Sequence, residues 1–86
     1  MNLNSKWKHQ LIIFVVNVYL TRLLKAVSLD KDPNKKRDVI KKVIAYMTLG
    51  IDVSRLYPEM VKASRTEDVV MKKMIYLYLI NYAEQN

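Results

Sequence analysis

Side chains that could carry out acid–base or nucleophilic chemistry are scarce in this sequence. The 86 residues include one histidine, His9, and no cysteine. No acidic residue lies near His9, so a histidine–carboxylate–nucleophile set would have to be assembled from distant segments. A solvated side chain is the simpler interpretation of His9. We therefore predict no catalytic residue and no enzymatic activity.

The acidic residues Asp30, Asp32 and Asp38 could in principle bind a divalent cation. Their spacing does not match an EF-hand loop, which also needs a glycine at a fixed position. The single glycine, Gly50, cannot form a phosphate-binding or dinucleotide-binding loop. We therefore predict helix caps and a solvated connection, with no metal ion and no cofactor.

Three tyrosines near the C-terminus could stack on bases, namely Tyr76, Tyr78 and Tyr82. A stacking platform needs exposed rings interleaved with basic residues. Here the rings alternate with leucine and isoleucine, and the nearest basic pair lies a turn away. This pattern favours core or interface packing.

The strongest polar feature is a basic cluster in a chain of formal net charge +7. It consists of Lys35, Lys36, Arg37, Lys41 and Lys42. Three interpretations remain open: a solvated helix face, contact with anionic lipid headgroups, and binding to nucleic acid. The charge indicates an anionic partner without identifying it.

The composition predicts that these residues lie on a few long helices. Glycine occurs once and proline twice, which is too few turn formers for a sandwich or barrel. Apolar residues at three- and four-residue steps predict helices over about 33–49, 53–64 and 66–84. Asp32 before Pro33, Asp52 (with Ser54 as the alternative) and Thr66 are the expected N-caps, and Gly50 is the expected C-terminal stop.

Residues 1–21 form an atypical apolar segment, which we predict to be helical and to continue to about Ser28. A basic start precedes an apolar run from Leu11 to Leu20, interrupted only by Asn17. Ten residues are fewer than the roughly 20 that cross a bilayer. The pattern is also typical of a signal peptide, but the small-residue cleavage site is missing. Two alternatives stay open: a targeting or anchoring segment, and a helix buried by the chain or by a partner.

The last predicted helix is apolar almost all round between Met74 and Ala83. Such a helix must be surrounded, and three short neighbours cannot cover all of it. We therefore expect an incomplete α-solenoid, whose end must contact another repeat or subunit. The candidate interface residues are Met74, Ile75, Tyr78, Leu79 and Tyr82.

Three ordered blocks of sequence resemble one family, the β subunits of heterotetrameric vesicle-coat adaptor complexes. Residues 41–54 resemble its KKVI-x-x-MT-x-G-x-DVS segment, residues 56–61 its LFP-x-VV helix, and residues 72–83 its KKLVYLYL-x-NYA helix. The resemblance covers about residues 22–86, and residues 1–21 do not share it. The segments 46–48 and 59–64 are most similar to the fourth adaptor class.

The resemblance implies an all-α, HEAT/armadillo-like solenoid fragment of about four antiparallel helices. It implies a non-enzymatic scaffold in intracellular, vesicle-mediated transport, with a second large, a medium and a small subunit as partners. The expected location is the cytoplasmic face of trans-Golgi or endosomal membranes. The family's basic surface matches Lys35, Lys36, Lys41 and Lys42 as candidate anionic-lipid contacts. The alternatives are a small basic helical protein that binds nucleic acid or an anionic membrane by itself, and a secreted or anchored protein.

Overall fold

The computed structural model describes residues 3–83, with side chains from Ser5 to Ala83. Its elements are α1 (Leu3–Ser28), α2 (Pro33–Thr48), the 3-10 turn η1 (Ser54–Leu56), α3 (Tyr57–Ala63) and α4 (Val69–Ala83). The predicted all-α class with about four helices is confirmed, and the described residues contain no strand. The division between residues 1–21 and 22–86 stays a prediction, because α1 passes through residue 21 without a break.

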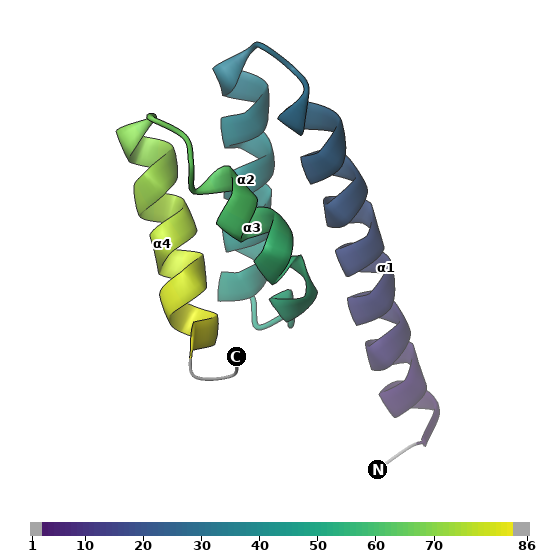
Figure 1. Cartoon of the computed structure of the whole chain (residues 1–86). Helices are drawn as coiled ribbons and strands as arrows, with labels where there is room; N and C mark the ends of the chain where they lie inside the picture. The colour runs from purple at the N-terminus through teal and green to yellow at the C-terminus, as the bar shows by residue number, and fades with distance from the viewer. Residues whose placement is uncertain (1–2, 84–86) are drawn as a thin grey trace.

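The helices form two antiparallel pairs that share one core (Figure 1). Helix α1 packs against α2 and α3, and α4 packs against α2 and α3. The core consists of Leu20, Leu24, Val39, Ile40, Val43, Val53, Leu56, Met60, Met71, Ile75, Tyr78 and Tyr82. Every helix contributes to this set, so no pair of helices can bury its apolar side without the other pair.

Helix α2 begins and ends where the sequence predicts. The Asp32 side chain accepts a hydrogen bond from the backbone N–H of Asn34, and Pro33 occupies the first turn. Proline is tolerated there because its missing N–H would have no helical partner. The helix stops at Leu49 and is followed by Gly50 at φ +88°, a left-handed conformation that favours glycine.

The last two helices begin differently from the prediction. The predicted helix from Val53 is a 3-10 turn followed by α3, with Pro58 in the first turn of α3. The prediction that Thr66 caps the last helix is wrong, because α4 begins at Val69 and the Asp68 carboxylate accepts from the N–H of Met71 at 3.0 Å. The Thr66 hydroxyl instead accepts a hydrogen bond from the N–H of Asp68, so Thr66 lies two residues before the cap. The predicted end at Glu84 lies outside the described residues.

Helix α1 is much longer than its partner. Its 26 residues extend about 39 Å, whereas the 16 residues of α2 extend about 24 Å. Its N-terminal half therefore projects past the bundle (Figure 1). The prediction of a helix ending at Ser28 is confirmed. The alternative that the chain itself buries this segment is wrong for most of the N-terminal half of α1, because the large apolar side chains there are about half-exposed.

Candidate functional site

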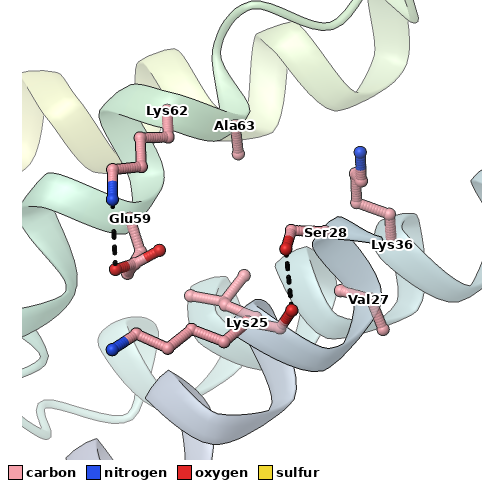
Figure 2. A pocket seen from close by; sticks show the side chains of 8 residues that line it. Lys25, Val27, Ser28, Lys36, Glu59, Lys62 and Ala63 are labelled. Carbon is pink, nitrogen blue, oxygen red and sulfur yellow. Dashed lines mark hydrogen bonds and ion pairs between the residues drawn. The ribbon is translucent and has the colours of Figure 1, made fainter. Parts of the chain in front are cut away.

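A cavity of about 440 Å³ opens where α1, α2 and α3 meet. Three lysines from three different helices line it: Lys25 from α1, Lys36 from α2 and Lys62 from α3. Figure 2 shows the amines of Lys25 and Lys62 on the same side as the Glu59 carboxylate, with Lys36 across the opening. The helix packing thus gathers cations that are far apart in sequence.

The electrostatics of this cavity favour anions. Glu59 forms an ion pair with Lys62, with 3.8 Å between the carboxylate oxygen and Nζ. The Ser28 hydroxyl donates to the backbone oxygen of Lys25 at 2.7 Å. One carboxylate therefore faces three ammonium groups, which leaves the lining positive. The lining contains no histidine. It is suited to attracting a negatively charged group and not to moving protons.

The predicted lysine set does not form one surface. Lys35 pairs with Asp30 at 3.2 Å, and Lys36 lines the cavity. Lys42 Nζ lies 3.4 Å from the hydroxyl of Tyr19 on α1, and Lys41 is exposed. Lys35 and Lys42 are two helical turns apart and share a side of α2, whereas Lys41 lies about 100° away from Lys42. As lipid contacts, the four lysines stay a prediction.

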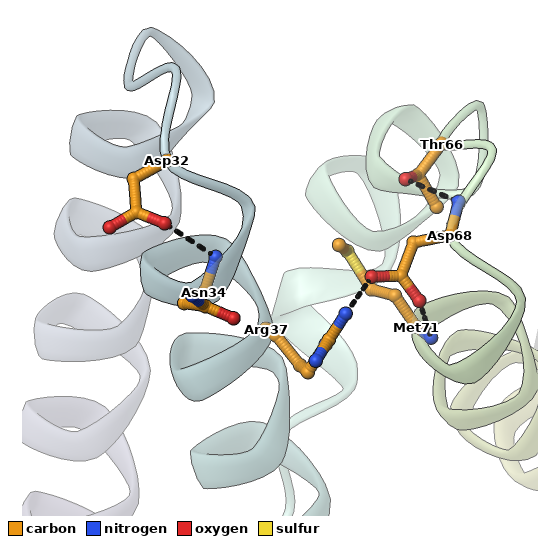
Figure 3. A network of polar contacts seen from close by, with 6 residues as sticks. All are labelled: Asp32, Asn34, Arg37, Thr66, Asp68 and Met71. Carbon is orange, nitrogen blue, oxygen red and sulfur yellow. Dashed lines mark hydrogen bonds and ion pairs between the residues drawn. The ribbon is translucent and has the colours of Figure 1, made fainter.

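The fifth member of the basic cluster, Arg37, has a structural role. Its guanidinium binds the carboxylate of Asp68, and this contact joins α2 to the start of α4 (Figure 3). The Arg37 hydrogen bond, followed by that from the N–H of Met71, lowers the pKa of the Asp68 carboxyl. Asp68 thus caps α4 and anchors it to α2 at the same time.

Two of the tyrosines hold the loop before η1. The hydroxyl of Tyr78 donates to the backbone oxygen of Val53 at 2.5 Å, and the backbone N–H of Val53 donates to the hydroxyl of Tyr82 at 3.0 Å. The two rings lie in the core with their centroids 4.9 Å apart. Burial raises the pKa of Tyr78 above its ordinary value. These tyrosines serve in packing, as their alternation with leucine and isoleucine predicts.

The exposed apolar side of α4 differs from the candidate interface set. Ile75, Tyr78 and Tyr82 are buried against the chain's own helices, and Met74 and Leu79 are partly buried against the same core. The large apolar side chains of α4 that are left exposed are Val69, Val70, Tyr76, Leu77 and Ile80. Contact of the first set with another molecule stays a prediction. Helix α4 is apolar on nearly all sides, but α2 and α3 cover only one of them. The opposite apolar side of α4 therefore stays exposed.

One buried polar residue on α1 makes a tertiary contact that the sequence did not predict. Asn17 is only 2% exposed, and its amide nitrogen donates to the carbonyls of Ile13 at 2.7 Å and Asp52 at 2.8 Å. It joins α1 to the loop that Tyr78 and Tyr82 hold from the other side. The available signal was its position as the one polar residue in an apolar run.

The cavity residues Lys25, Glu59 and Lys62 were also not predicted as site residues. No spacing rule connects them, because they belong to separate helices that meet only in the fold. Across residues 3–83, no group of three or more histidine, cysteine or acidic side chains is arranged to hold a metal ion.

Comparison with known proteins gives the family. The family described as "Adaptin N terminal region" matches residues 16–86, which is most of the chain. The chain belongs to the adaptin N-terminal family. Its helical pairs are therefore those of an adaptin, and the predicted solenoid-like fold class is confirmed.

The adaptin relatives are β subunits. The chain is 60% identical over 53 residues to Beta-adaptin-like protein A of Arabidopsis thaliana, which covers 62% of this chain and 6% of the relative. It is 48% identical over 61 residues to the AP-1 complex subunit beta-1 of Homo sapiens, 71% of this chain and 6% of the relative. It is 35% identical over 57 residues to the AP-4 complex subunit beta of Dictyostelium discoideum, 66% of this chain and 7% of the relative.

These numbers limit what similarity to the adaptins supports. The chain spans between 6% and 7% of the length of these relatives. The similarity supports a β subunit of an adaptor complex and does not single out the fourth class, because both AP-1 and AP-4 subunits match. The match begins inside α1, so residues 3–15 of that helix lie outside the adaptin region.

Proposed function

We propose that this chain is a non-enzymatic scaffold fragment of a vesicle-coat adaptor complex, made of the first helical repeats of a β subunit. The observation that carries the proposal is the exposed apolar side of α4, in a chain of the adaptin family. Ile80 is 73% exposed and Leu77 lies beside it on the surface. Solenoid repeats bury such sides against a neighbouring repeat or subunit, and an uncovered end is unfavourable in water.

The proposed partners are the other adaptor subunits: a second large, a medium and a small subunit. The proposed location is the cytoplasmic face of trans-Golgi or endosomal membranes, in intracellular protein transport. We keep the fourth adaptor class as the proposed class, supported by the resemblance of segments 46–48 and 59–64. The identity of the medium subunit that co-purifies with the chain tests it, since each class has its own.

The anionic-lipid contact of Lys35, Lys36, Lys41 and Lys42 is part of the same proposal. Each cation near an anionic surface contributes about 1 kcal/mol. The pairing of Lys35 with Asp30 and the position of Lys36 in the cavity reduce what these two residues contribute. Lys41 and Lys42 are exposed and lie outside both the Lys35–Asp30 pair and the cavity, so they are expected to carry most of the effect.

Co-precipitation of the tagged chain from cells tests the scaffold proposal. Recovery of large or medium adaptor subunits is expected. The double substitution Leu77→Asp and Ile80→Asp places charge on the exposed side of α4 and is expected to abolish this recovery. The matched control changes two other exposed leucines, Leu29→Asp and Leu49→Asp, which lie in turns outside α4.

Two results of this experiment would contradict the proposal. Equal loss of adaptor subunits with both double variants would show that the effect is not local to α4. Recovery of no adaptor subunit by the unmodified chain, with the chain monomeric and folded, would refute the scaffold role.

A further inference from the structure

The N-terminal half of α1 has an apolar face whose side chains stay about half-exposed in the described part of the chain. Its half-exposed side chains are Trp7, Leu11, Ile12, Phe14, Val15, Val18 and Tyr19. Positions 7, 11, 14 and 18 follow at three- and four-residue steps and lie on one side of the helix. The buried residues Asn17, Leu20 and Leu24 lie on another side, toward the core. The helix therefore has two apolar sides, one for the core and one for a partner.

This face lies mainly on the part of α1 that the adaptin match does not include. The match begins at residue 16, whereas Trp7, Leu11, Phe14 and Val15 precede it. The same part projects beyond the bundle in Figure 1. The partner of this face is thus not expected to be the one that covers adaptin repeats.

Cations surround the face, and α1 contains no acidic residue. Each aromatic ring of this α1 face has a cation beside it: Lys8 Nζ lies 6.0 Å from the Trp7 ring centre, the Arg55 guanidinium 5.8 Å from that of Phe14, and Lys42 Nζ 5.9 Å from that of Tyr19. Aromatic rings with neighbouring cations are typical of side chains at the headgroup level of a bilayer, where rings are half-immersed and long cationic side chains reach water.

A basic hollow adjoins the same face. It has a volume of about 300 Å³ and is lined by Asn17, Val18, Thr21, Arg22, Lys25 and Arg55. Arg22 and Lys25 follow Val18 by four and seven residues, so they continue the apolar side of α1 as a basic end. A lipid headgroup suits this arrangement. Its phosphate would contact the three cations, and its acyl chains would contact the apolar surface beside them.

We propose that this face of α1 docks flat on an anionic lipid bilayer, with the apolar side chains in the interface and a lipid phosphate at Arg22, Lys25 and Arg55. The charge decides against a second copy of the chain as the occupant. Two such faces would bring their cations together without any acid on α1 to balance them.

Docking in the plane of the membrane fits the fold better than crossing it. Residues 5–28 are long and apolar enough to cross a bilayer, a property that soluble core helices and signal sequences share. Crossing would pull Asn17, Leu20 and Leu24 out of the core, where Asn17 holds the loop through Asp52. Flat docking uses only side chains that are already exposed.

This contact deepens the membrane association in the proposed function but uses another helix and needs no adaptor subunit. Trp7 is the only tryptophan and reports directly on it. The purified chain is mixed with vesicles of phosphatidylcholine alone or with added phosphatidylserine. We expect co-flotation with the anionic vesicles, a blue shift of Trp7 emission, and quenching by lipids brominated near the headgroup.

Two matched triple variants locate the contact. Leu11→Ser, Phe14→Ser and Val15→Ser together are expected to weaken partitioning at least about tenfold. The control substitutes three exposed apolar residues of α4, Val70→Ser, Leu77→Ser and Ile80→Ser, and is expected to bind like the parent. Circular dichroism checks that both remain helical.

The charge variants separate this site from the lysines of the proposed function. The triple variant Arg22→Gln, Lys25→Gln and Arg55→Gln is expected to weaken binding to anionic vesicles more than the triple variant Lys35→Gln, Lys36→Gln and Lys41→Gln, which removes the same charge. The opposite order would assign the contact to α2 and overturn the inference. So would unchanged Trp7 emission, equal loss with the α4 control, or binding that resists alkaline carbonate extraction, which would indicate a spanning helix.

Discussion

The hydrogen bond from Tyr78 to Val53 gives the sharpest test of how the loop before η1 is held. Substituting phenylalanine for Tyr78 keeps the ring and removes only the hydroxyl, so the buried carbonyl of Val53 loses one of two hydrogen bonds and keeps the one from the N–H of Leu56 at 3.1 Å. The loss of one such hydrogen bond costs about 0.5–1.5 kcal/mol. For a domain of this size, each 1 kcal/mol lowers the melting temperature by about 4–8 °C.

The alkaline side of the stability profile provides a second signature of the same contact. Burial raises the pKa of Tyr78 in the folded chain above its value of 10.0 in the unfolded chain. The unfolded state therefore releases this proton first, and stability is complete below about pH 10 and falls above it. The slope contributed by one proton is about 1.4 kcal/mol per pH unit. The Tyr78→Phe variant lacks this contribution and is expected to show a shallower alkaline decline.

Urea unfolding followed by circular dichroism at low temperature, from pH 7 to pH 11, measures both effects. Tyr76→Phe is the matched control, because Tyr76 lies on the same helix and is half-exposed. It is expected to change stability by less than about 0.5 kcal/mol. If Tyr78→Phe unfolds at the same urea concentration as Tyr76→Phe, or declines as steeply above pH 10 as the parent, the assigned role of Tyr78 is wrong.

Three further predictions follow from single contacts. Asp68→Asn removes a carboxyl group whose pKa is lowered in the folded chain. The variant therefore lacks a contribution to stability that the parent loses as the pH falls through about 4. In an acid titration, its loss of helicity is expected to be smaller than in the parent and in the control Asp38→Asn. Asn17→Asp replaces the donor to Asp52 with a buried carboxylate, and is expected to lower the urea unfolding free energy by about 3 kcal/mol or more, with partial recovery at acidic pH. Gly50→Ala is expected to lower it by about 1 kcal/mol through backbone strain alone, because no atom lies near the added carbon; an unchanged value would contradict the left-handed turn.

The family relationship and the membrane inference bear on different halves of the molecule. The adaptin match covers the core and the exposed side of α4, which point to a neighbouring repeat or subunit. The projecting half of α1 carries its own apolar face with cations around it. The two proposals therefore assign a coat subunit to one face of the molecule and lipid to another.

Local features could be predicted because they depend on near neighbours in the chain. Asp32 and Pro33 begin α2, and Gly50 follows its end, since capping and left-handed turns need particular side chains at particular steps. The three- and four-residue spacing of apolar residues likewise gave α2 its buried side. The start of α4 was predicted at Thr66 instead of Asp68, because both residues can cap and only the Arg37 contact favours the second.

The sequence by itself determined the helices, their basic charge and the family, because these depend on periodicity, composition and ordered blocks of residues. The tertiary structure alone decided which side of each helix is covered. In α1 and α4 nearly every side is apolar, so the pattern could not say that Tyr78 lies inside and Ile80 outside. It also could not bring Lys25, Lys36 and Lys62 to one cavity. Which side of a helix is buried depends on how helices distant in sequence pack together. The spacing of apolar residues within one helix does not determine that packing.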